Sequence, residues 1–265
     1  MKYYIILKGG LGNQIFILVE AMRLLDKGLY VKLNDSQYTF RNNSERHLVL
    51  NKLFPKIYNN LCMNQPWKFF QFFFAKFFFK ATKKNLISFY KYRISDSYHQ
   101  YIDLDFHYKY YTKLADAFKF DSKFKNFLAV HIRRGDYKLA KHSLHGLVDI
   151  NSIISEIQYA CNLNKLFSNV IIFSDSVEEI RQYKIESHFK KLKIQYDNSK
   201  TNLDAFEKMA SCGGLIAGNS SYSVLAGVIN LKEKQFFSIP MLWTIKQNSY
   251  SIGLKNIRRY KCTLS

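Results

Sequence analysis

Two adjacent arginines and an aspartate stand close together in the heptapeptide His131-Ile132-Arg133-Arg134-Gly135-Asp136-Tyr137, directly after the apolar run Phe127–Val130. An arginine stays charged and donates hydrogen bonds in a fork that matches phosphate oxygens. In open α/β sheets, ligands bind beyond the carboxyl ends of the strands. The pattern therefore predicts an oxyanion-binding loop, and an arginine–aspartate pair on the surface is the plain structural alternative.

Two further turns also follow apolar runs. The turn Gly9-Gly10-Leu11-Gly12 has neither the G-x-G-x-x-G spacing of a dinucleotide site nor the lysine of a P-loop, so it predicts a tight strand-to-helix turn. The turn Gly218-Asn219-Ser220-Ser221 follows the run Leu215–Ala217. Serine hydroxyls and free N–H groups at a helix start suit a diphosphate, but the same residues also suit ordinary N-capping.

The apolar periodicity around these turns predicts an α/β protein. Tyr3–Leu7 and Tyr30–Leu33 are typical of buried strands, and Gln14–Lys27 between them has helical spacing. The clear pattern returns with strands expected at 127–130, 170–173, 193–196, 215–217 and 236–239, and helices at 150–162, 177–183 and 204–211. Between about residues 36 and 122 the pattern is weak. We expect two lobes, 1–122 and 123–265.

The chain is strongly basic, with 40 Lys and Arg against 20 Asp and Glu and a formal net charge of +20. A protein of this charge is expected to meet a polyanion, which can be nucleic acid, anionic lipid or a phosphorylated substrate. An AT-rich genome would also enrich lysine, phenylalanine and tyrosine without selection. Because no RNP, KH or zinc-finger pattern is present, we do not expect a nucleic acid partner; a nucleic-acid-binding protein is kept as the alternative from another class.

The four cysteines, Cys62, Cys161, Cys212 and Cys262, include no C-x-x-C pair. Neither a disulfide framework nor a zinc site is expected, which favours a reducing cytoplasm. The apolar run at Tyr3–Leu7 is ended by Lys8 and two glycines, too early for an export signal.

The segment Pro66–Lys80 holds eight phenylalanines together with Lys68, Lys76 and Lys80. One interpretation is a helix that docks on a membrane, with rings in the headgroup region and lysines on anionic lipid. The other is a buried helix of the first lobe whose lysines extend to the surface.

The heptapeptide resembles the HxRRGD motif of fucosyltransferases that use GDP-fucose, and in full it resembles the bacterial branch of glycosyltransferase family 11, the α-1,2-fucosyltransferases. Other stretches agree, in the expected order along the chain. They are Lys8–Phe16 with its GGLGNQ turn, Phe173-Ser174-Asp175, the late signature Met209–Ala226, and the closing pair Pro240 and Trp243.

This resemblance implies a GT-B-like fold of two Rossmann-like lobes with the active site in the cleft between them. Lobe 123–265 would bind GDP-fucose, and lobe 1–122, with its aromatic and basic helical insertion, would face the acceptor. The implied reaction is an inverting, metal-independent transfer of L-fucose to O2 of a galactoside in surface glycan synthesis. The acceptor could be lipid-linked, which would bring the enzyme to the inner face of the cytoplasmic membrane as a peripheral protein.

The resemblance also implies roles for single residues. Arg133, and with it Arg134, would hold the β-phosphate and neutralise charge on the departing GDP, which a metal does elsewhere. Asp136 would orient the arginines or touch the fucose. The other implied residues are His131 and Asp175 for the guanine, Asn219, Ser220, Ser221 and Ser223 for the diphosphate, and Gly10, Gly12, Asn13 and Gln14 for the fucose or acceptor.

Some positions are open or depart from the family pattern. Asp175 could instead cap a helix. His145 is a candidate general base, although a loop histidine without a chemical role fits equally well. Departures from the family are Ser176 in place of a second aspartate, Gly213 and Gly214 in place of His-Asn, and Val224 and Leu225 in place of Trp-Trp. They leave open transfer of another GDP-linked deoxysugar, or an inactive homologue.

Overall fold

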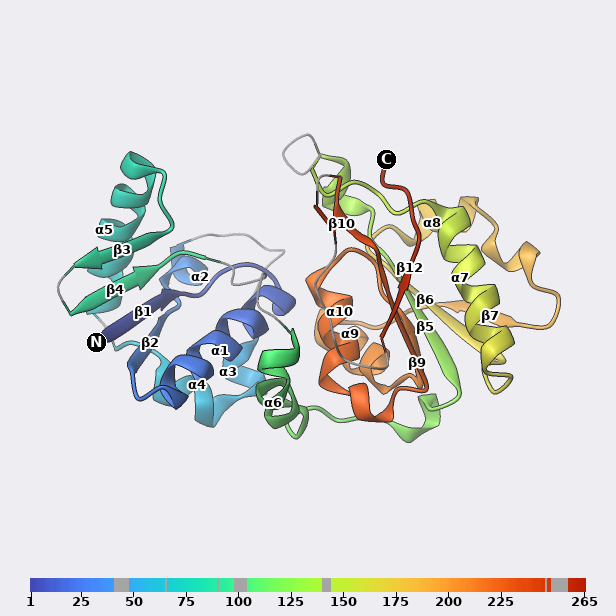
Figure 1. Cartoon of the computed structure of the whole chain (residues 1–265), viewed down its shortest axis with the longest axis horizontal. Coiled ribbons are helices and arrows are strands. Elements are labelled where there is room, and N and C mark those ends of the chain that lie inside the picture. Colours follow the sequence, from blue (N-terminus) through green and yellow to red (C-terminus); the bar gives the residue numbers. More distant parts are fainter. Residues whose placement is uncertain are drawn as a thin grey trace. The chain divides into compact units, whose positions relative to one another are not determined.

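The structure is a computed structural model that describes residues 1–40, 48–64, 66–89, 91–97, 104–139, 144–245, 247–248 and 257–265. The chain forms two compact units, which Figure 1 shows. Unit 1 comprises Met1–Ile102 and Lys109–Ala117, and unit 2 comprises Asp103–Tyr108 and Phe118–Ser265. Each unit has helices and a sheet that contains parallel strands, so the predicted α/β class is confirmed.

The sheet of unit 1 has the strand order β2-β1-β4-β3. Strands β1 (Lys2–Ile6), β2 (Tyr30–Asn34) and β4 (Tyr92–Ser95) are parallel, and β3 (Leu86–Phe89) pairs antiparallel with β4. Helix α1 (Leu11–Asp26) connects β1 to β2, as the apolar spacing predicted. It is buried over most of its length because its apolar residues occupy several sides of the helix.

The turn between β1 and α1 depends on a glycine. Gly9 has a φ of +80°, and a Cβ atom there would lie 2.6 Å from Nδ2 of Asn13. Two side chains donate hydrogen bonds to the carbonyl oxygen of Gly9, Gln14 from Nε2 at 3.1 Å and Tyr38 from its hydroxyl at 2.7 Å. The turn is therefore fixed in one conformation at the carboxyl end of β1.

The middle of the chain is helical, in the region where the sequence pattern was weak. The helices are α2 (Ser36–Phe40), α3 (Leu50–Leu53), α4 (Pro55–Leu61), α5 (Trp67–Thr82) and α6 (Leu104–Ala115). Pro55 stands at the start of α4, where its missing N–H costs nothing. Within the described part of the chain, every helix is too short or too polar to cross a lipid bilayer.

The sheet of unit 2 has six strands in the order β12-β9-β8-β5-β6-β7, and all its neighbours are parallel. Five of these strands confirm the predictions, and β12 was not predicted. The strands are β5 (Phe127–Ile132), β6 (Asn169–Ser174), β7 (Lys193–Tyr196), β8 (Gly214–Ile216), β9 (Phe236–Pro240) and β12 (Arg258–Tyr260).

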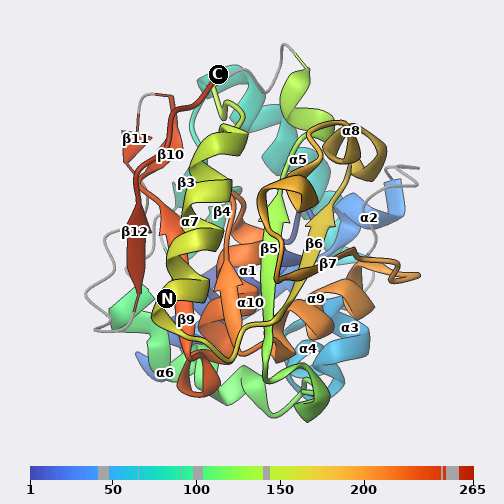
Figure 2. The same ribbon diagram turned by 90° about the vertical axis from the view of Figure 1, so that its right-hand side faces the viewer.

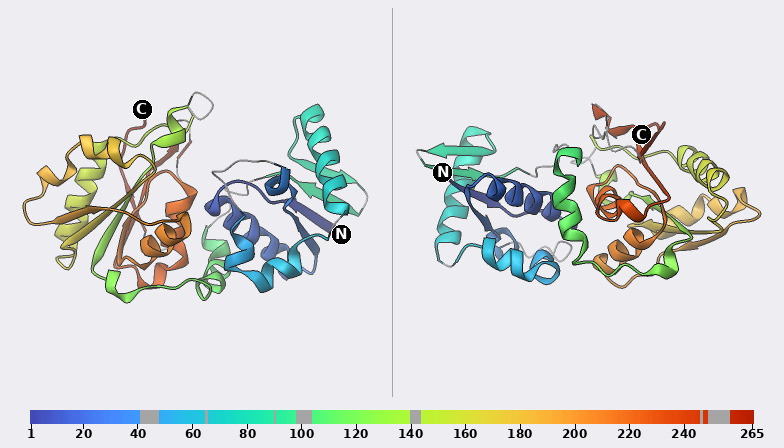
Figure 3. Two further views of the ribbon diagram at one scale, coloured as in Figure 1. Left: turned by 180° about the vertical axis from the view of Figure 1, so that it is seen from behind. Right: turned by 60° about the horizontal axis from the view of Figure 1, so that its bottom comes forward.

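Helices cover both faces of this sheet (Figures 2 and 3). Leu128, Val130 and Ile132 of β5 belong to one core cluster with residues of α7 and α8. His131, between them on the strand, lies on the other face, beside Tyr222 of α10. The helices are α7 (Ile150–Leu163), α8 (Val177–Gln182), α9 (Asn202–Ser211) and α10 (Ser221–Ile229). Short 3-10 turns lie at Ser122–Phe124, Gly135–Lys138, Ile185–His188 and Leu231–Glu233. A small hairpin is formed by β10 (Leu242–Thr244) and β11 (Gln247–Asn248).

The strand order defines where a ligand is expected. From β5 the chain continues through β6 to β7 on one side of the sheet, and it then returns to β8 and continues to β9 and β12 on the other side. The carboxyl ends of β5 and β8 therefore flank a topological switch point, which is where open parallel sheets bind ligands. The heptapeptide 131–137 and the turn 218–221 follow these two strands.

Candidate functional site

Arg133 is the first residue after β5, and two carboxylates hold its side chain. Its Nε and Nη2 donate to Oδ1 of Asp136 at 3.1 and 2.6 Å, and its Nη1 lies 3.0 Å from Oδ2 of Asp175. The side chain keeps 29% of its surface exposed. Arg133 is thus both oriented and accessible, which is what an anion-binding arginine requires.

Arg134 has a different position although it is the next residue. Its side chain is only 3% exposed, and its Nη2 donates to the carbonyl oxygen of Val148 at 2.9 Å. Its Nη1 donates to the carbonyl oxygen of Arg133 at 3.2 Å. These bonds direct the guanidinium of Arg134 into unit 2, so it stabilises the loop that carries Arg133.

Asp175 follows β6, the neighbour of β5, and its carboxylate belongs to the same network. Oδ2 pairs with Arg133, and Oδ1 accepts from the backbone N–H of Arg134 at 2.9 Å. A Cβ atom on Gly135 would lie 2.3 Å from Oδ2 of Asp175, so the glycine is needed for this close approach. The N-cap position of α8 is Ser176 and not Asp175. Both carboxylate oxygens therefore serve the arginine loop.

Asn219 joins three segments of unit 2. Its Nδ2 donates to the carbonyl oxygens of His145 and Gly146 at 2.8 and 3.2 Å, and that of Trp243 lies 3.4 Å away. The hydroxyl of Tyr137 donates to the carbonyl oxygen of Asn219 at 3.0 Å. The ring of Tyr137 also stacks on that of His145, with centroids 4.7 Å apart. The structure thus brings His145 and Asn219 together with the arginine loop.

The three predicted serines have unequal positions at the start of α10. Ser220 is the N-cap residue, but its side chain makes no capping hydrogen bond. Ser221 is the first residue of the helix, and Ser223 is fully buried, where its hydroxyl donates to the carbonyl oxygen of Ser220 at 3.2 Å. The positive end of the α10 dipole lies at the carboxyl end of β8, which favours an anion there.

His131 is buried on the α10 face of β5. Its ring lies 5.8 Å from that of Tyr222, and a Cβ atom on Gly218 would lie 3.3 Å from its Nδ1. The pKa of His131 is lowered to about 3, mainly because burial disfavours the charged imidazolium and also because Arg133 is positive. Among the described residues, Nδ1 of His131 has no hydrogen-bond partner. A neutral imidazole here contributes shape to the site, but no charge.

The four predicted residues of unit 1 lie at the turn after β1. Gly10 precedes α1, and Gly12 and Asn13 are in its first turn. Gln14 is fully buried, and its Oε1 accepts from the N–H of Val49 at 3.0 Å, so this side chain ties the turn to α3.

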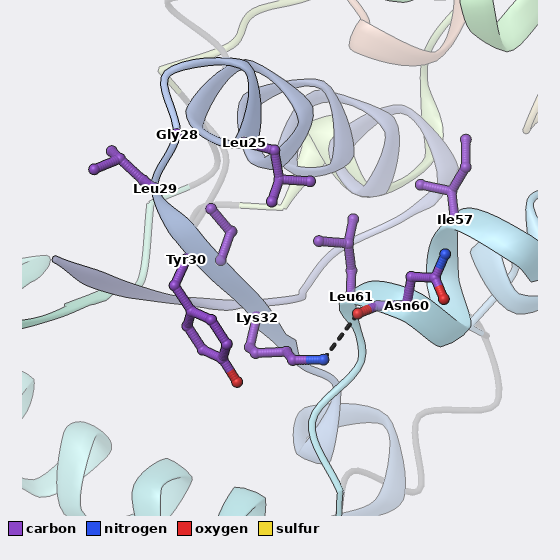
Figure 4. A pocket seen from close by; sticks show the side chains of 9 residues that line it. Leu25, Gly28, Leu29, Tyr30, Lys32, Ile57, Asn60 and Leu61 are labelled. Carbon is purple, nitrogen blue, oxygen red and sulfur yellow. Dashed lines mark hydrogen bonds between the residues drawn. The ribbon is translucent and has the colours of Figure 1, made fainter.

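A mostly apolar groove lies at the amino end of β2 in unit 1 (Figure 4). In it, Lys32 donates from Nζ to the carbonyl oxygen of Asn60 at 2.8 Å, and the other labelled residues are Leu25, Gly28, Leu29, Tyr30, Ile57 and Leu61. The amino ends of parallel strands are not where such sheets bind ligands, and none of the predicted site residues lines this groove.

Reasoning from sequence assigned no role to Tyr137 and Glu179. Tyr137 is within the heptapeptide, and its link to His145 and Asn219 depends on residues 8 and 82 positions away. Oε2 of Glu179 lies 2.7 Å from Nζ of Lys138. Its Oε1 lies 3.8 Å from Nε of Arg134. The sequence distinguished Glu179 only as an acidic residue in the first turn of a helix. Among the described residues, no group of three or more His, Cys, Asp or Glu side chains could hold a metal ion.

Comparison with known proteins identifies the family. The model of glycosyl transferase family 11 matches residues 2–240. An alpha-1,2-colitosyltransferase of Escherichia coli is 31% identical over 102 residues, which are 37% of this chain and 34% of the relative, so the match spans about a third of that curated protein.

Solved structures are similar at a greater distance. POFUT1 in complex with GDP is 12% identical with a TM-score of 0.45, over 98% of both chains. POFUT1 in complex with GDP-fucose is 10% identical with a TM-score of 0.43, over 98% of this chain and 97% of that one. A glycosyl transferase family 9 protein from Veillonella parvula is 12% identical with a TM-score of 0.43, over 100% and 88%. On the family match over residues 2–240, the chain belongs to glycosyltransferase family 11 and is a glycosyltransferase.

Proposed function

We propose that this enzyme transfers L-fucose from GDP-fucose to a sugar hydroxyl, O2 of a galactoside, during synthesis of a surface glycan. The observation that carries the proposal is Arg133, an accessible guanidinium held between Asp136 and Asp175 at the switch point of the unit 2 sheet. The start of α10 follows the adjacent strand and offers a second source of positive potential. Both features suit the binding of a diphosphate.

In the proposed reaction, the acceptor hydroxyl oxygen attacks the anomeric carbon of fucose while the bond from that carbon to the β-phosphate oxygen breaks. Negative charge grows on the departing phosphate, and Arg133 and the N-terminus of α10 stabilise it. Preorganised charge of this kind usually contributes more to catalysis than any other single effect. Direct displacement inverts the configuration at the anomeric carbon. These groups would replace a metal ion, so we propose a metal-independent enzyme.

The other residues of the network act through Arg133. Asp136 and Asp175 orient its guanidinium. Arg134 holds the loop in place through its hydrogen bond to the carbonyl oxygen of Val148. His131 is buried, neutral and beside the turn 218–221, so it would complete the wall of the nucleotide site. His145 is our candidate for the base that accepts the hydroxyl proton, because its ring stacks on Tyr137 within the same network.

One of the relatives suggests a second donor. The relative in Escherichia coli is a colitosyltransferase, and colitose is L-fucose without its 3-hydroxyl. A site with a protein group that hydrogen-bonds the 3-hydroxyl of fucose would reject GDP-colitose strongly. A site shaped for colitose would lack this protein group. We therefore keep transfer of another GDP-linked deoxysugar as the second candidate.

The test is a screen of GDP-fucose and GDP-colitose against galactosides, with the linkage of the product assigned by NMR. An α-1,2-fucosyl product formed more efficiently than its colitosyl counterpart supports the first proposal. Preference for GDP-colitose would replace it with the second. Hydrolysis of neither donor, together with no GDP binding, would show an inactive homologue.

We also propose that the enzyme acts in the cytoplasm. All four cysteines are free, and burial raises the pKa of Cys161 to about 11 and that of Cys212 to about 12. These thiols stay protonated and inert, as expected of structural cysteines in a reducing compartment. Fractionation of the native host cells tests this, with the enzyme expected in the cytosolic and inner-membrane fractions.

A further inference from the structure

Helix α5 has two different faces, and one of them packs in unit 1. Phe72, Ala75 and Phe79 are buried and form a core cluster with Ile6 of β1 and Ile87 of β3. Their spacing of three and four residues places them on one side of the helix. This face corresponds to the core interpretation of the phenylalanine run.

The opposite side exposes large aromatic rings to solvent. Trp67, Phe70, Phe73, Phe74 and Phe77, here called the aromatic face, are exposed by 52–77%. The rings of Trp67 and Phe70 are 6.4 Å apart, and those of Phe70 and Phe74 stack at 6.5 Å. A contiguous exposed apolar surface of this kind usually marks an interaction site.

The chain around the aromatic face carries charge of one sign. Residues 46–95 contain ten Lys or Arg and no Asp or Glu. Lys80, Lys83 and Lys84 are exposed at the end of α5. Lys80 follows Phe77 by three residues and Phe73 by seven, so it borders the aromatic face.

Two lysines of α5 do not contribute to this surface charge, contrary to the interpretation from sequence. Lys68 is buried and pairs with Asp35 at 2.9 Å, and Lys76 pairs with Asp96 at 2.8 Å. Both acids come from other parts of unit 1, so these pairs anchor α5 to its unit. The positive charge available for a partner is therefore at the C-terminal end of the helix.

We propose that the aromatic face of α5 docks on the surface of an anionic lipid bilayer. Rings of Trp and Phe partition into the headgroup region, and lysines beside them are attracted to anionic lipid. A second copy of this chain would bring two sets of like charges together, which disfavours it as the occupant. The proposal is independent of which sugar the enzyme transfers.

Trp67 gives a direct measurement. The chain has two tryptophans, Trp67 on the aromatic face and the buried Trp243. In a Trp243→Phe background, emission from Trp67 should shift to the blue when vesicles of 70% phosphatidylcholine and 30% phosphatidylglycerol are added, and brominated lipid should quench it. Pure phosphatidylcholine vesicles, or 0.5 M salt, should largely abolish the shift.

Two variants and a matched control test the face itself. The triple variant Phe70→Ser, Phe74→Ser, Phe77→Ser keeps the buried side of α5, so it should stay folded by circular dichroism but sediment with anionic vesicles more than tenfold less. Lys80→Glu, Lys83→Glu, Lys84→Glu should lose the preference for anionic lipid. The control Leu163→Ser, Leu166→Ser removes exposed apolar side chains of unit 2 and should bind as the parent does.

The same variants can overturn the proposal. It fails if the folded triple variant sediments with vesicles like the parent, or if the unit 2 control loses binding equally. It also fails if light scattering shows a dimer that the triple variant converts to a monomer without any vesicle binding by the parent, because the aromatic face would then be covered by a second copy.

Discussion

Arg133 and Asp175 come from the ends of neighbouring strands, β5 and β6, and Nη1 of the arginine lies 3.0 Å from Oδ2 of the carboxylate. The contact joins residues 42 positions apart in the sequence, and it exists because the two strands are parallel and in register to His131–Phe173 and Ile132–Ser174. The sheet itself therefore orients the proposed phosphate-binding group. Such pre-orientation is what makes a charged donor effective in catalysis.

Arg133→Ala should remove nearly all transfer while the protein stays folded, since the side chain lies beyond the carboxyl end of β5 and is partly exposed. Losing a charged donor in the transition state costs roughly 3–4 kcal/mol, a factor of hundreds in rate. Arg133→Lys should restore little, because an ammonium cannot reach Asp136 and Asp175 in the same fork. Initial rates with GDP-fucose measure this, and near-normal turnover of the alanine variant would exclude the proposed site.

Asp175→Asn should weaken GDP binding and turnover together. Each carboxylate oxygen accepts from a donor, one on Arg133 and one on the N–H of Arg134, so an amide must turn its NH₂ group toward one of them. The mismatch should cost about 1.5–3 kcal/mol, seen as a ten- to hundredfold loss by calorimetry with GDP. Glu178→Gln, on the exposed side of the adjacent helix, is the control and should leave GDP affinity unchanged.

Gly135→Ala should disturb the same contact by crowding. A Cβ atom at this position would lie 2.3 Å from Oδ2 of Asp175, so the loop or the carboxylate must move. We expect a loss of stability of about 1–3 kcal/mol in urea unfolding. In an Asp175→Ala background the same substitution should cost less, because the crowded atom is gone. Additive losses in this double-mutant cycle would show that the strain lies elsewhere.

Much of unit 2 could be predicted from sequence, because continuous apolar runs followed by polar turns identify buried parallel strands. Strand β12 was not predicted, because Arg258 and Arg259 are exposed at the edge of the sheet and only Tyr260 is buried. The sequence also did not predict that Arg133 is accessible while Arg134 is buried. The inward turn of Arg134 depends on the carbonyl oxygen of Val148, which tertiary packing places there.

Helix α5 shows a different limit. Phenylalanine occurs on every side of it, so its periodicity is weak and the buried side could not be identified from the sequence. The sheet decides which rings are buried, through Ile6 and Ile87. The two interpretations of the run therefore apply to opposite faces of one helix, and a variant that mixes the faces, such as Phe72 with Phe77, could not separate them.

Activity should persist in excess EDTA. The proposal rests on Arg133 and the N-terminus of α10, which would do at the phosphates what a divalent cation does in other enzymes. Rates with and without EDTA, and with added magnesium or manganese, measure this. If chelation abolishes transfer and a metal restores it, the donor site needs another group.

His131 should make stability depend on pH. Its pKa is lowered from 6.5 to about 3 in the folded protein, since burial and Arg133 oppose the imidazolium. Between these values the unfolded chain binds a proton that the folded one does not, so stability falls as the pH decreases below about 6.5. From pH 7.5 to pH 5 this one group should lower the free energy of unfolding by about 2 kcal/mol.

His131→Asn removes the titration and should reduce the pH slope of urea unfolding by that amount, whatever its effect on stability at pH 7.5. His188→Asn, at an exposed histidine, should keep the slope of the parent. An unchanged slope in the His131 variant would show that this imidazole can accept a proton without unfolding, and that the wall it forms at the nucleotide site is open to water.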